Sequence, residues 1–248
     1  MTWLLAIGGT DSSGGAGLSA DADACHLDLR TVVTAATQQS DDAVQDTGPR
    51  DPDVWLFEAL SAMAVDNPGA IKFGLLPGPG HVRSALAVID QVRFEDPTLP
   101  FVVDPVLASS SGHEFLRAEE AQPLLDRPIV LTPNLPEAAA LTGAPLELLV
   151  RDRGARLAAA QKLLQRGLRA VVIKGGHAAD GDACDLVLEP GQSPVWSSRS
   201  RIPGPGIRGS GCRFATALAA HLAQGAGLPE AAAAAADLVA ARIADSLG

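Results

Sequence analysis

Short apolar runs alternate with longer amphipathic stretches along the chain. The runs FVVD, ending at Asp104, and AVVIK, ending at Lys174, place apolar side chains at consecutive positions. Strands buried on both faces have this pattern, as in a parallel sheet covered by helices. We therefore predict strands at Trp3–Ile7, Thr31–Ala35, Ala70–Leu75, Phe101–Asp104, Pro128–Thr132 and Arg169–Lys174.

The stretches between these runs have the spacing of helices. They predict helices at Ala16–Leu27, Asp53–Val65, His81–Phe94, Leu135–Leu141, Arg153–Gln165, Ser210–Ala223 and Pro229–Leu247. Strands that alternate with helices favour one three-layer α/β domain, here over residues 1–248. The segment Asp182–Arg201 differs, because its short extended pieces DLVL and PVWSS predict an antiparallel edge. The predicted fold class is an α/β/α sandwich with a mostly parallel central sheet.

Polar or glycine-rich segments follow five of the predicted strands. They contain Gly8–Asp11, Lys72 with Gly74, Asp104, Thr132–Asn134 and Lys174–His177. In sheets of this class, ligands bind beyond the carboxyl ends of the strands. We therefore predict a ligand site at this edge of the sheet.

Composition narrows the class of protein. Of the 248 residues, 47% are hydrophobic, which supports a sizeable core and excludes wholesale disorder. Lys and Arg number 19 against 29 Asp and Glu, so the formal net charge is −10. Binding of nucleic acid needs a basic face, so we expect no nucleic-acid partner. A small anionic ligand needs only a local positive site and remains compatible with this charge.

The cysteines and the first residues indicate a cytoplasmic protein. Cys25, Cys184 and Cys212 are widely spaced and form no C-x-x-C pair, so we expect neither a disulfide framework nor a structural zinc site. The start MTWLLAIGG has no basic region and predicts a strand rather than a signal peptide. No uncharged apolar run approaches 18 residues, so we expect no membrane-spanning segment.

The loop GGTDSSGGAG, residues Gly8–Gly17, precedes a predicted helix. Glycines let the backbone approach a ligand closely, and hydroxyl and amide donors converge in such a loop. The alternative is a turn and a helix cap, with Asp11, Ser12 or Ser13 as the N-cap residue. The loop alone supports both interpretations equally. It is not a Walker A loop, because the G-x-x-x-x-G-K-[ST] pattern does not occur.

A second glycine-rich segment, Arg208–Cys212, runs into an amphipathic stretch. Successive backbone N–H groups at a helix N-terminus form an anion hole for phosphate. Cys212 is predicted to lie in the first turn, where the helix dipole lowers the pKa of a thiol. The alternative is a small buried cysteine in a tight turn.

Charged and amide side chains after three further strands could contact a metal ion, a substrate or a phosphate. Asn134 and Glu137 share one face of a predicted helix start, where they could hold hydrated Mg²⁺ beside phosphates or form a capping box. Asp104 ends a very apolar strand and fits a metal or substrate contact, or a strand-end cap. Lys174 could reach a phosphate from its strand end, or be solvated at the surface.

These segments together, in order, resemble one family. IGGTDSSGGAGLSAD, TAATQQ, IKFGLL, VVDPVLASSSG, LTPNLPEAAALTG, VVIKGGH and GSGC are similar to the hydroxymethylpyrimidine/phosphomethylpyrimidine kinases of the ribokinase-like superfamily. The resemblance covers Trp3 to about His221. It implies a ribokinase-like fold, a homodimer, and phosphorylation of a small pyrimidine substrate with Mg²⁺ and ATP in thiamin biosynthesis.

The resemblance also implies roles for particular residues. The anion hole is formed by Gly209, Ser210 and Gly211, and Cys212 is the catalytic base. The pyrimidine-binding positions are Gly9, Asp21, Gln39, Leu75 and Val106. The positions on the ATP side are Asp104, Asn134, Glu137 and Lys174, and two of these, Asp104 and Glu137, contact Mg²⁺, partly through water.

The chain departs from the family pattern at several positions. Arg208 stands where the family usually has His, Ser210 where it has Thr, and Leu75 where Met is common. Ser110 replaces a Lys or Thr that is frequent after the Asp-Pro strand. Two alternatives therefore accompany the kinase interpretation. One is a pyridoxal-type kinase with a similar cysteine site, and the other is a non-catalytic pyrimidine or nucleotide sensor.

Overall fold

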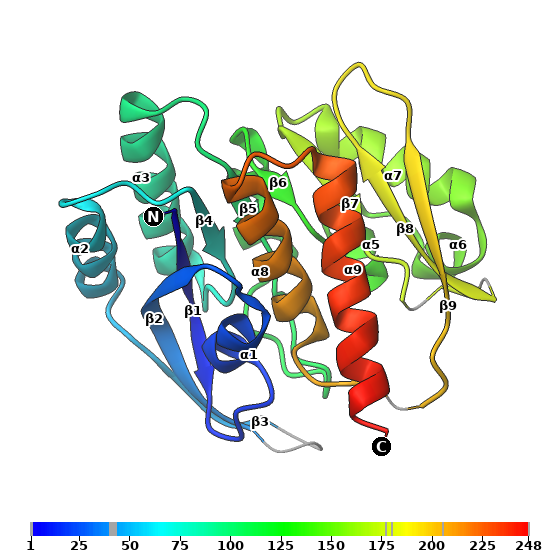
Figure 1. Ribbon diagram of the computed structural model, residues 1–248, viewed down its shortest axis with the longest axis horizontal. Coiled ribbons are helices and arrows are strands. Elements are labelled where there is room, and N and C mark those ends of the chain that lie inside the picture. Colours follow the sequence, from blue (N-terminus) through cyan, green and yellow to red (C-terminus); the bar gives the residue numbers. More distant parts are fainter. Residues whose placement is uncertain (1, 40–43, 177, 180, 205, 248) are drawn as a thin grey trace.

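One twisted sheet organises the computed structural model, which describes residues 2–39, 44–176, 178–179, 181–204 and 206–247. Within these residues the sheet has nine strands, in the order β3-β2-β1-β4-β5-β6-β7-β8-β9. The strands from β2 to β9 follow this order from left to right in Figure 1. The strands are β1 (Trp3–Asp11), β2 (Asp28–Gln39), β3 (Val44–Pro49), β4 (Ala70–Phe73), β5 (Phe101–Val103), β6 (Val130–Leu131), β7 (Ala170–Ile173), β8 (Asp182–Leu188) and β9 (Val195–Ser200).

The sheet is parallel at its centre and antiparallel at both edges. Strands β2, β1, β4, β5, β6 and β7 pair in parallel, whereas β3 pairs antiparallel with β2. Strands β8 and β9 form the antiparallel edge that was predicted for Asp182–Arg201. All six predicted strands are present, with ends that differ by a few residues. The sequence did not predict β3, whose residues VQDTGP carry a weak strand signal.

The seven predicted helices are also present. The helices are α1 (Gly17–Ala24), α2 (Pro52–Met63), α3 (Pro79–Glu95), α4 (Ala118–Ala121), α5 (Leu135–Thr142), α6 (Leu146–Arg151), α7 (Arg153–Leu164), α8 (Ser210–Ala223) and α9 (Leu228–Asp245), with a 3-10 turn η1 (Gln122–Asp126). The short α4, η1 and α6 were not predicted, because one or two turns produce little periodic signal.

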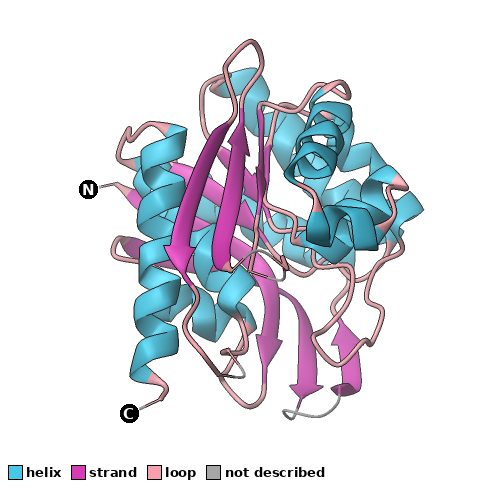
Figure 2. Cartoon of the chain, turned by 90° about the vertical axis from the view of Figure 1, so that its right-hand side faces the viewer, coloured by secondary structure: helices cyan, strands magenta, loops and turns pink. Residues whose placement is uncertain are grey.

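Helices cover both faces of the sheet (Figure 2). Alternate residues of a strand belong to different cores on these two faces. Leu5 and Ile7 of β1 belong to a core shared with α2, α3, α5 and α7. Leu4 belongs to a second core, which is shared with α8 and α9. Helix α1 packs on α8 in the same layer (Figure 1). The predicted three-layer α/β/α arrangement with a mostly parallel sheet is confirmed.

The same alternation places three charged residues on the α8 side. Ala70, Val102 and Val172 contribute to the core under α8 and α9, and Lys72, Asp104 and Lys174 each lie two residues further along. Because side chains repeat every second residue along a strand, all three point towards the layer of α1 and α8. Because the strands are parallel, all three also lie at the carboxyl ends of the strands, on the same side of the sheet.

None of the helices in the described parts of the chain is both long enough and apolar enough to cross a membrane.

Candidate active site

The N-terminus of α8 is a tight turn built on glycine. Gly209 has φ +69°, in the left-handed region, and a Cβ there would lie 2.6 Å from the carbonyl oxygen of Gly15. No described side chain caps the helix, so the first amides after Gly209 remain available to an acceptor. A Cβ on Gly211 would lie 3.1 Å from Lys174 Nζ and 3.3 Å from Asp104 Oδ2. The turn therefore lies directly against the side chains of Lys174 and Asp104, two of the predicted site residues.

Lys174 and Asp104 form an ion pair beneath this turn. Lys174 Nζ donates to Asp104 Oδ1 at 2.7 Å. Burial alone would lower the pKa of Lys174, but the carboxylates of Asp104 and Glu137 raise it, so the ammonium stays charged. The predicted surface solvation of Lys174 is wrong, since its side chain is only 13% exposed.

Glu137 and Asn134 form the capping box that was one of two predicted interpretations. The Glu137 carboxylate accepts from the Asn134 backbone N–H, and Asn134 Oδ1 accepts from the Glu137 backbone N–H, both at 2.8 Å. Burial raises the pKa of Glu137, and the charge of Asp104 raises it further. The backbone N–H of Lys174 donates to Pro133 at 2.9 Å, which ties β7 to the start of α5.

A metal ion fits this part of the site only with help from a ligand. Among the described residues, no three His, Cys, Asp or Glu side chains are close enough together to hold a metal ion. Asp104 directly follows β5 and Glu137 lies in the first turn of α5, and both carboxylates are buried. Mg²⁺ is commonly held by one or two carboxylates together with substrate phosphates and water, so the donor set fits that mode of binding.

Asp21 belongs to a different, closed cluster. Both its carboxylate oxygens accept from Lys72 Nζ at 2.9 Å, and Oδ1 also accepts from Thr216 Oγ1 at 2.8 Å. The Lys72 and Asp21 side chains are 1% and 0% exposed. The carboxylate, carried by α1, is thus bonded to β4 and α8, and it lies inside the packing between these three elements. Its predicted contact with a pyrimidine stays a prediction.

Cys212 lies in the first turn of α8, between these two clusters. Burial raises the pKa of its thiol to about 11, although the Lys72 charge and the Gly17 backbone N–H act in the opposite direction. The negative charges of Asp21 and Asp104 raise it further. The net shift is opposite to the predicted lowering, because the loss of water around the thiol is the largest contribution to its pKa.

The Gly-rich loop after β1 folds around Asp11. The Asp11 carboxylate accepts from the backbone N–H groups of Ser13 and Ala16 and from Nη2 of Arg208. The N-cap residue of α1 is Ala16, so the prediction of Asp11, Ser12 or Ser13 at that position is wrong. Asp11 still satisfies a free amide at the helix start, from five residues away.

Two of the predicted pyrimidine-binding residues lie side by side. A Cβ on Gly9 would lie 2.7 Å from Leu75 Cδ2. The Leu75 carbonyl accepts from Thr34 Oγ1 at 2.6 Å, which fixes the start of the segment after β4. Val106 follows β5, and its backbone N–H donates to the backbone carbonyl oxygen of Asp104 at 2.8 Å. The backbone of Gln39 ends β2, but its side chain lies outside the described part of the structure.

Some contacts that shape the site have no signal in the local sequence. Asp185 Oδ1 of β8 accepts from the Gly175 backbone N–H at 2.7 Å, and a Cβ on Gly175 would lie 1.8 Å from the Cys184 carbonyl oxygen. Lys72 does have a signal, because a lysine inside the apolar strand AIKF needs a buried partner. That signal does not say which acid is the partner.

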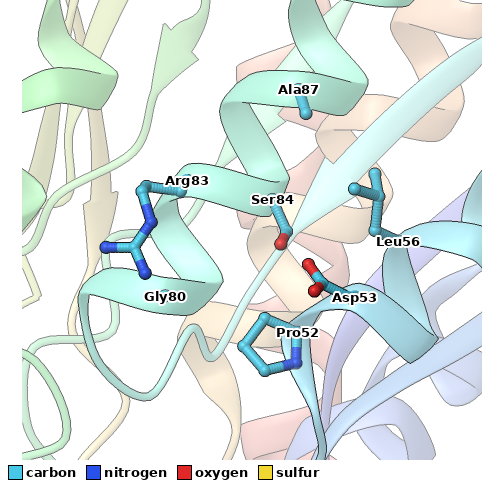
Figure 3. A pocket seen from close by; sticks show the side chains of 7 residues that line it. All are labelled: Pro52, Asp53, Leu56, Gly80, Arg83, Ser84 and Ala87. Carbon is cyan, nitrogen blue, oxygen red and sulfur yellow. The ribbon is translucent and has the colours of Figure 1, made fainter.

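A groove lies between the N-terminal halves of α2 and α3 (Figure 3). Its lining residues are Pro52, Asp53, Leu56, Gly80, Arg83, Ser84 and Ala87. None of the predicted site residues lines it, so the candidate active site remains the edge of the sheet at the start of α8.

Comparison with known proteins gives a consistent result. A sequence model of the family described as phosphomethylpyrimidine kinase matches residues 11–248. A Bacillus subtilis hydroxymethylpyrimidine/phosphomethylpyrimidine kinase is 32% identical and covers 98% of this chain and 90% of that protein. A Streptomyces coelicolor protein with the same description is 35% identical over 95% of this chain and 86% of that protein. The structure of Staphylococcus aureus pyridoxal kinase in complex with ADP matches with a TM-score of 0.84 and 29% identity, over 98% of this chain and 88% of that chain.

Proposed function

Because the chain belongs to the phosphomethylpyrimidine kinase family, we propose that it transfers a phosphoryl group from ATP to 4-amino-5-hydroxymethyl-2-methylpyrimidine, to its monophosphate, or to both, in thiamin biosynthesis. The reaction is a phosphotransfer on a ribokinase-like fold. We propose that residues 1–248 act as a single kinase domain, as a homodimer in the cytoplasm. Light scattering of the purified protein tests the dimer.

The observation that carries this proposal is the position of the glycine turn at α8. Gly211 lies against Lys174 and Asp104. The backbone amides of the turn, an ammonium group and a carboxylate are therefore close neighbours. Phosphoryl transfer needs positioning and charge stabilisation more than covalent participation by the protein. Amides at a helix N-terminus and a nearby lysine supply both for a transferring phosphate.

The proposed roles divide between the two sides of α8. On the nucleotide side, Lys174 binds a phosphate, Asn134 and Glu137 orient the nucleotide, and the amides of Gly209–Gly211 stabilise the charge that develops during transfer. Asp104 and Glu137 would hold Mg²⁺, which neutralises phosphate charge when bound.

On the acceptor side, Gly9, Leu75 and Val106 form the wall against which the pyrimidine ring lies, and Gln39 reads its polar edge. The close contact between Gly9 and Leu75 supports this assignment. Asp21 is proposed to act from behind this wall through its bond to Thr216 of α8, since its carboxylate is enclosed.

Cys212 is proposed to accept the proton of the acceptor hydroxyl. Its thiol pKa of about 11 means that the thiolate is a small fraction at neutral pH and increases with pH. A base of this kind makes kcat rise by roughly tenfold per pH unit below the pKa. Cys212→Ser should lower kcat by roughly 10²–10⁴-fold, because a serine hydroxyl is a far weaker base, and should leave ATP affinity unchanged. A folded Cys212→Ser enzyme with wild-type kcat would refute the base assignment.

The substrate is tested by assaying Mg-ATP turnover with hydroxymethylpyrimidine, its monophosphate and pyridoxal side by side. The match to Staphylococcus aureus pyridoxal kinase favours pyridoxal as the second candidate acceptor. Turnover with pyridoxal alone would replace the pyrimidine proposal with this one. Ligand-induced thermal stabilisation without any phosphorylated product would instead identify a sensor.

A further inference from the structure

The arginine that precedes the anion-binding turn reaches back to the Gly-rich loop. Arg208 donates from Nη2 to Asp11 Oδ2 and from Nη1 to Ser13 Oγ, both at 2.9 Å. The Arg208 side chain is 16% exposed and that of Asp11 is 1% exposed. Salt and water therefore screen this ion pair much less than they screen a pair on the surface.

Asp11 is the centre around which the loop folds, so its charge matters to the whole loop. Its carboxylate accepts from Ser13 N at 3.0 Å, Ser13 Oγ at 2.9 Å and Ala16 N at 2.9 Å. These three donors are neutral, whereas Arg208 brings a full positive charge to the same carboxylate. Without that charge, a buried anion would remain with neutral donors only among these contacts, and the loop would lose the strongest of its bonds.

The backbones on the two sides of the ion pair also touch. A Cβ on Gly209 would lie 2.6 Å from the Gly15 carbonyl oxygen and 2.8 Å from Ala16 Cα. Arg213, one turn into α8, donates to the Gly15 carbonyl at 3.2 Å and to the Arg208 carbonyl at 2.8 Å. A shift of the loop would therefore move the turn whose amides face the transferring phosphate.

We propose that Arg208 is a positioning residue: its ion pair with Asp11 holds the Gly-rich loop and the anion-binding turn in one fixed arrangement, which sets the acceptor hydroxyl in line with the phosphate. The inference rests on the proposed kinase function. Misplacement of reacting groups by about 1 Å can cost about 10²-fold in rate, so loss of Arg208 acts mainly on kcat. Binding of ATP depends on the residues that follow β5 and β7 and on those at the start of α5, and it is affected little.

The test compares Arg208→Gln and Arg208→Lys with the control Arg242→Gln. Arg242 donates to Asp23 at 3.0 Å from α9, so the control removes an arginine bonded to the far end of α1. Arg208→Gln should lower kcat by about 10- to 100-fold and change the KM for ATP by less than about threefold. Arg208→Lys should recover part of the loss, because an ammonium keeps the charge but lacks the fork that reaches both partners.

Hydrogen exchange provides a readout that needs no turnover. In Arg208→Gln, the amides of residues 12–17 and 210–212 should exchange faster by about tenfold or more, with no change in Arg242→Gln. Exchange and kcat at wild-type values in Arg208→Gln would overturn the proposal, as would an equal fall in kcat in the control. If the wild-type protein phosphorylates none of the acceptors, the kinase function fails, while faster exchange in Arg208→Gln would still support the contact as the link between loop and turn.

Discussion

Two lysine–aspartate pairs lie on the α8 side of the sheet, and their surroundings differ. Lys72 and Asp21 pair at 2.9 Å with side chains that are 1% and 0% exposed. Lys174 and Asp104 pair at 2.7 Å with side chains that are 13% and 4% exposed. The first pair is completed by a threonine of α8, whereas the second borders the glycine turn at the start of that helix. The same two residue types thus form an enclosed packing element in one place and, in the other, the pair that we propose contacts a phosphate.

The comparison indicates that the degree of burial decides whether removing one member of a pair lowers stability or activity. In a fully enclosed pair, neither charge can regain water if its partner is removed, so the cost falls on folding. In the second pair, the lysine lies next to the glycine turn of α8, so we propose that an incoming phosphate can share it. The substitution of each lysine by methionine, which keeps most of the volume and removes the charge, separates these two cases.

The largest effect is expected for Lys72→Met. It leaves the enclosed Asp21 carboxylate without its positive partner, and breaking a buried pair in this way costs about 3–5 kcal/mol of unfolding free energy. Urea unfolding measures the loss. The double variant Lys72→Met/Asp21→Asn should be more stable than Lys72→Met alone, and additive effects of the two changes would contradict the pairing.

Lys174→Met is expected to act on activity instead. Removal of a charged donor beside a transferring phosphate should lower kcat/KM by roughly 10²–10³-fold, with a smaller loss of unfolding free energy than in Lys72→Met. The matched control is Lys162→Met, because Lys162 donates to a backbone carbonyl at Thr142, away from the α8 turn. Unfolding of Lys174→Met as severe as that of Lys72→Met would remove the distinction between the pairs.

Gly211→Ala tests how closely the turn approaches the second pair. The added methyl group would lie 3.1 Å from Lys174 Nζ and 3.3 Å from Asp104 Oδ2, so one neighbour must shift by a few tenths of an ångström. We expect kcat to fall by about tenfold. Gly176→Ala is the control, because a Cβ at Gly176 meets no described atom within 4 Å. Equal kcat in the two variants would show that the contact is unimportant.

The smallest effect concerns the Cys212 thiol between the pairs. Asp104 raises the thiol pKa and Lys72 lowers it, so Asp104→Asn should lower this pKa and Lys72→Met should raise it. Since the thiolate is the reactive form, alkylation of Cys212 at a given pH should be faster than wild type in the first variant and slower in the second. Peptide-resolved mass spectrometry reads the rates, and identical pH profiles for both variants would refute this coupling.

The two pairs also show which features can be predicted from sequence. Asp104 and Lys174 stand at the ends of apolar strands, and parallel strands end at one edge, so their proximity follows from the predicted fold. The partner of Lys72 could not be deduced, because Asp21 lies on a helix whose pairing with β4 depends on how layers pack. The same holds for Arg208 and Asp11, which are far apart along the chain.

The burial of an individual polar side chain cannot be predicted from the sequence. The rule that a helix N-terminus lowers a thiol pKa predicted the wrong direction for Cys212, because the loss of water depends on the elements packed around it. Likewise β3 was missed, since its strand character comes from pairing with β2 rather than from its own residues. Predictions that rest on local periodicity were confirmed. Features that depend on the packing of distant segments could not be predicted from the sequence.

The Lys72–Asp21 pair and the Arg208–Asp11 pair differ, finally, in when they can form during synthesis. Lys72 and Asp21 are 51 residues apart and can meet once the first third of the chain has left the ribosome. Arg208 and Asp11 are separated by 197 residues, and the bond from Arg213 to Gly15 spans 198. Contacts this distant close large loops of the chain, and N-terminal segments fold first during translation. The Lys72–Asp21 pair can therefore form early in elongation, whereas its bond to Thr216 and the Arg208–Asp11 bond can form only when α8 has been synthesised and docks. The proposed active site is complete only at that stage.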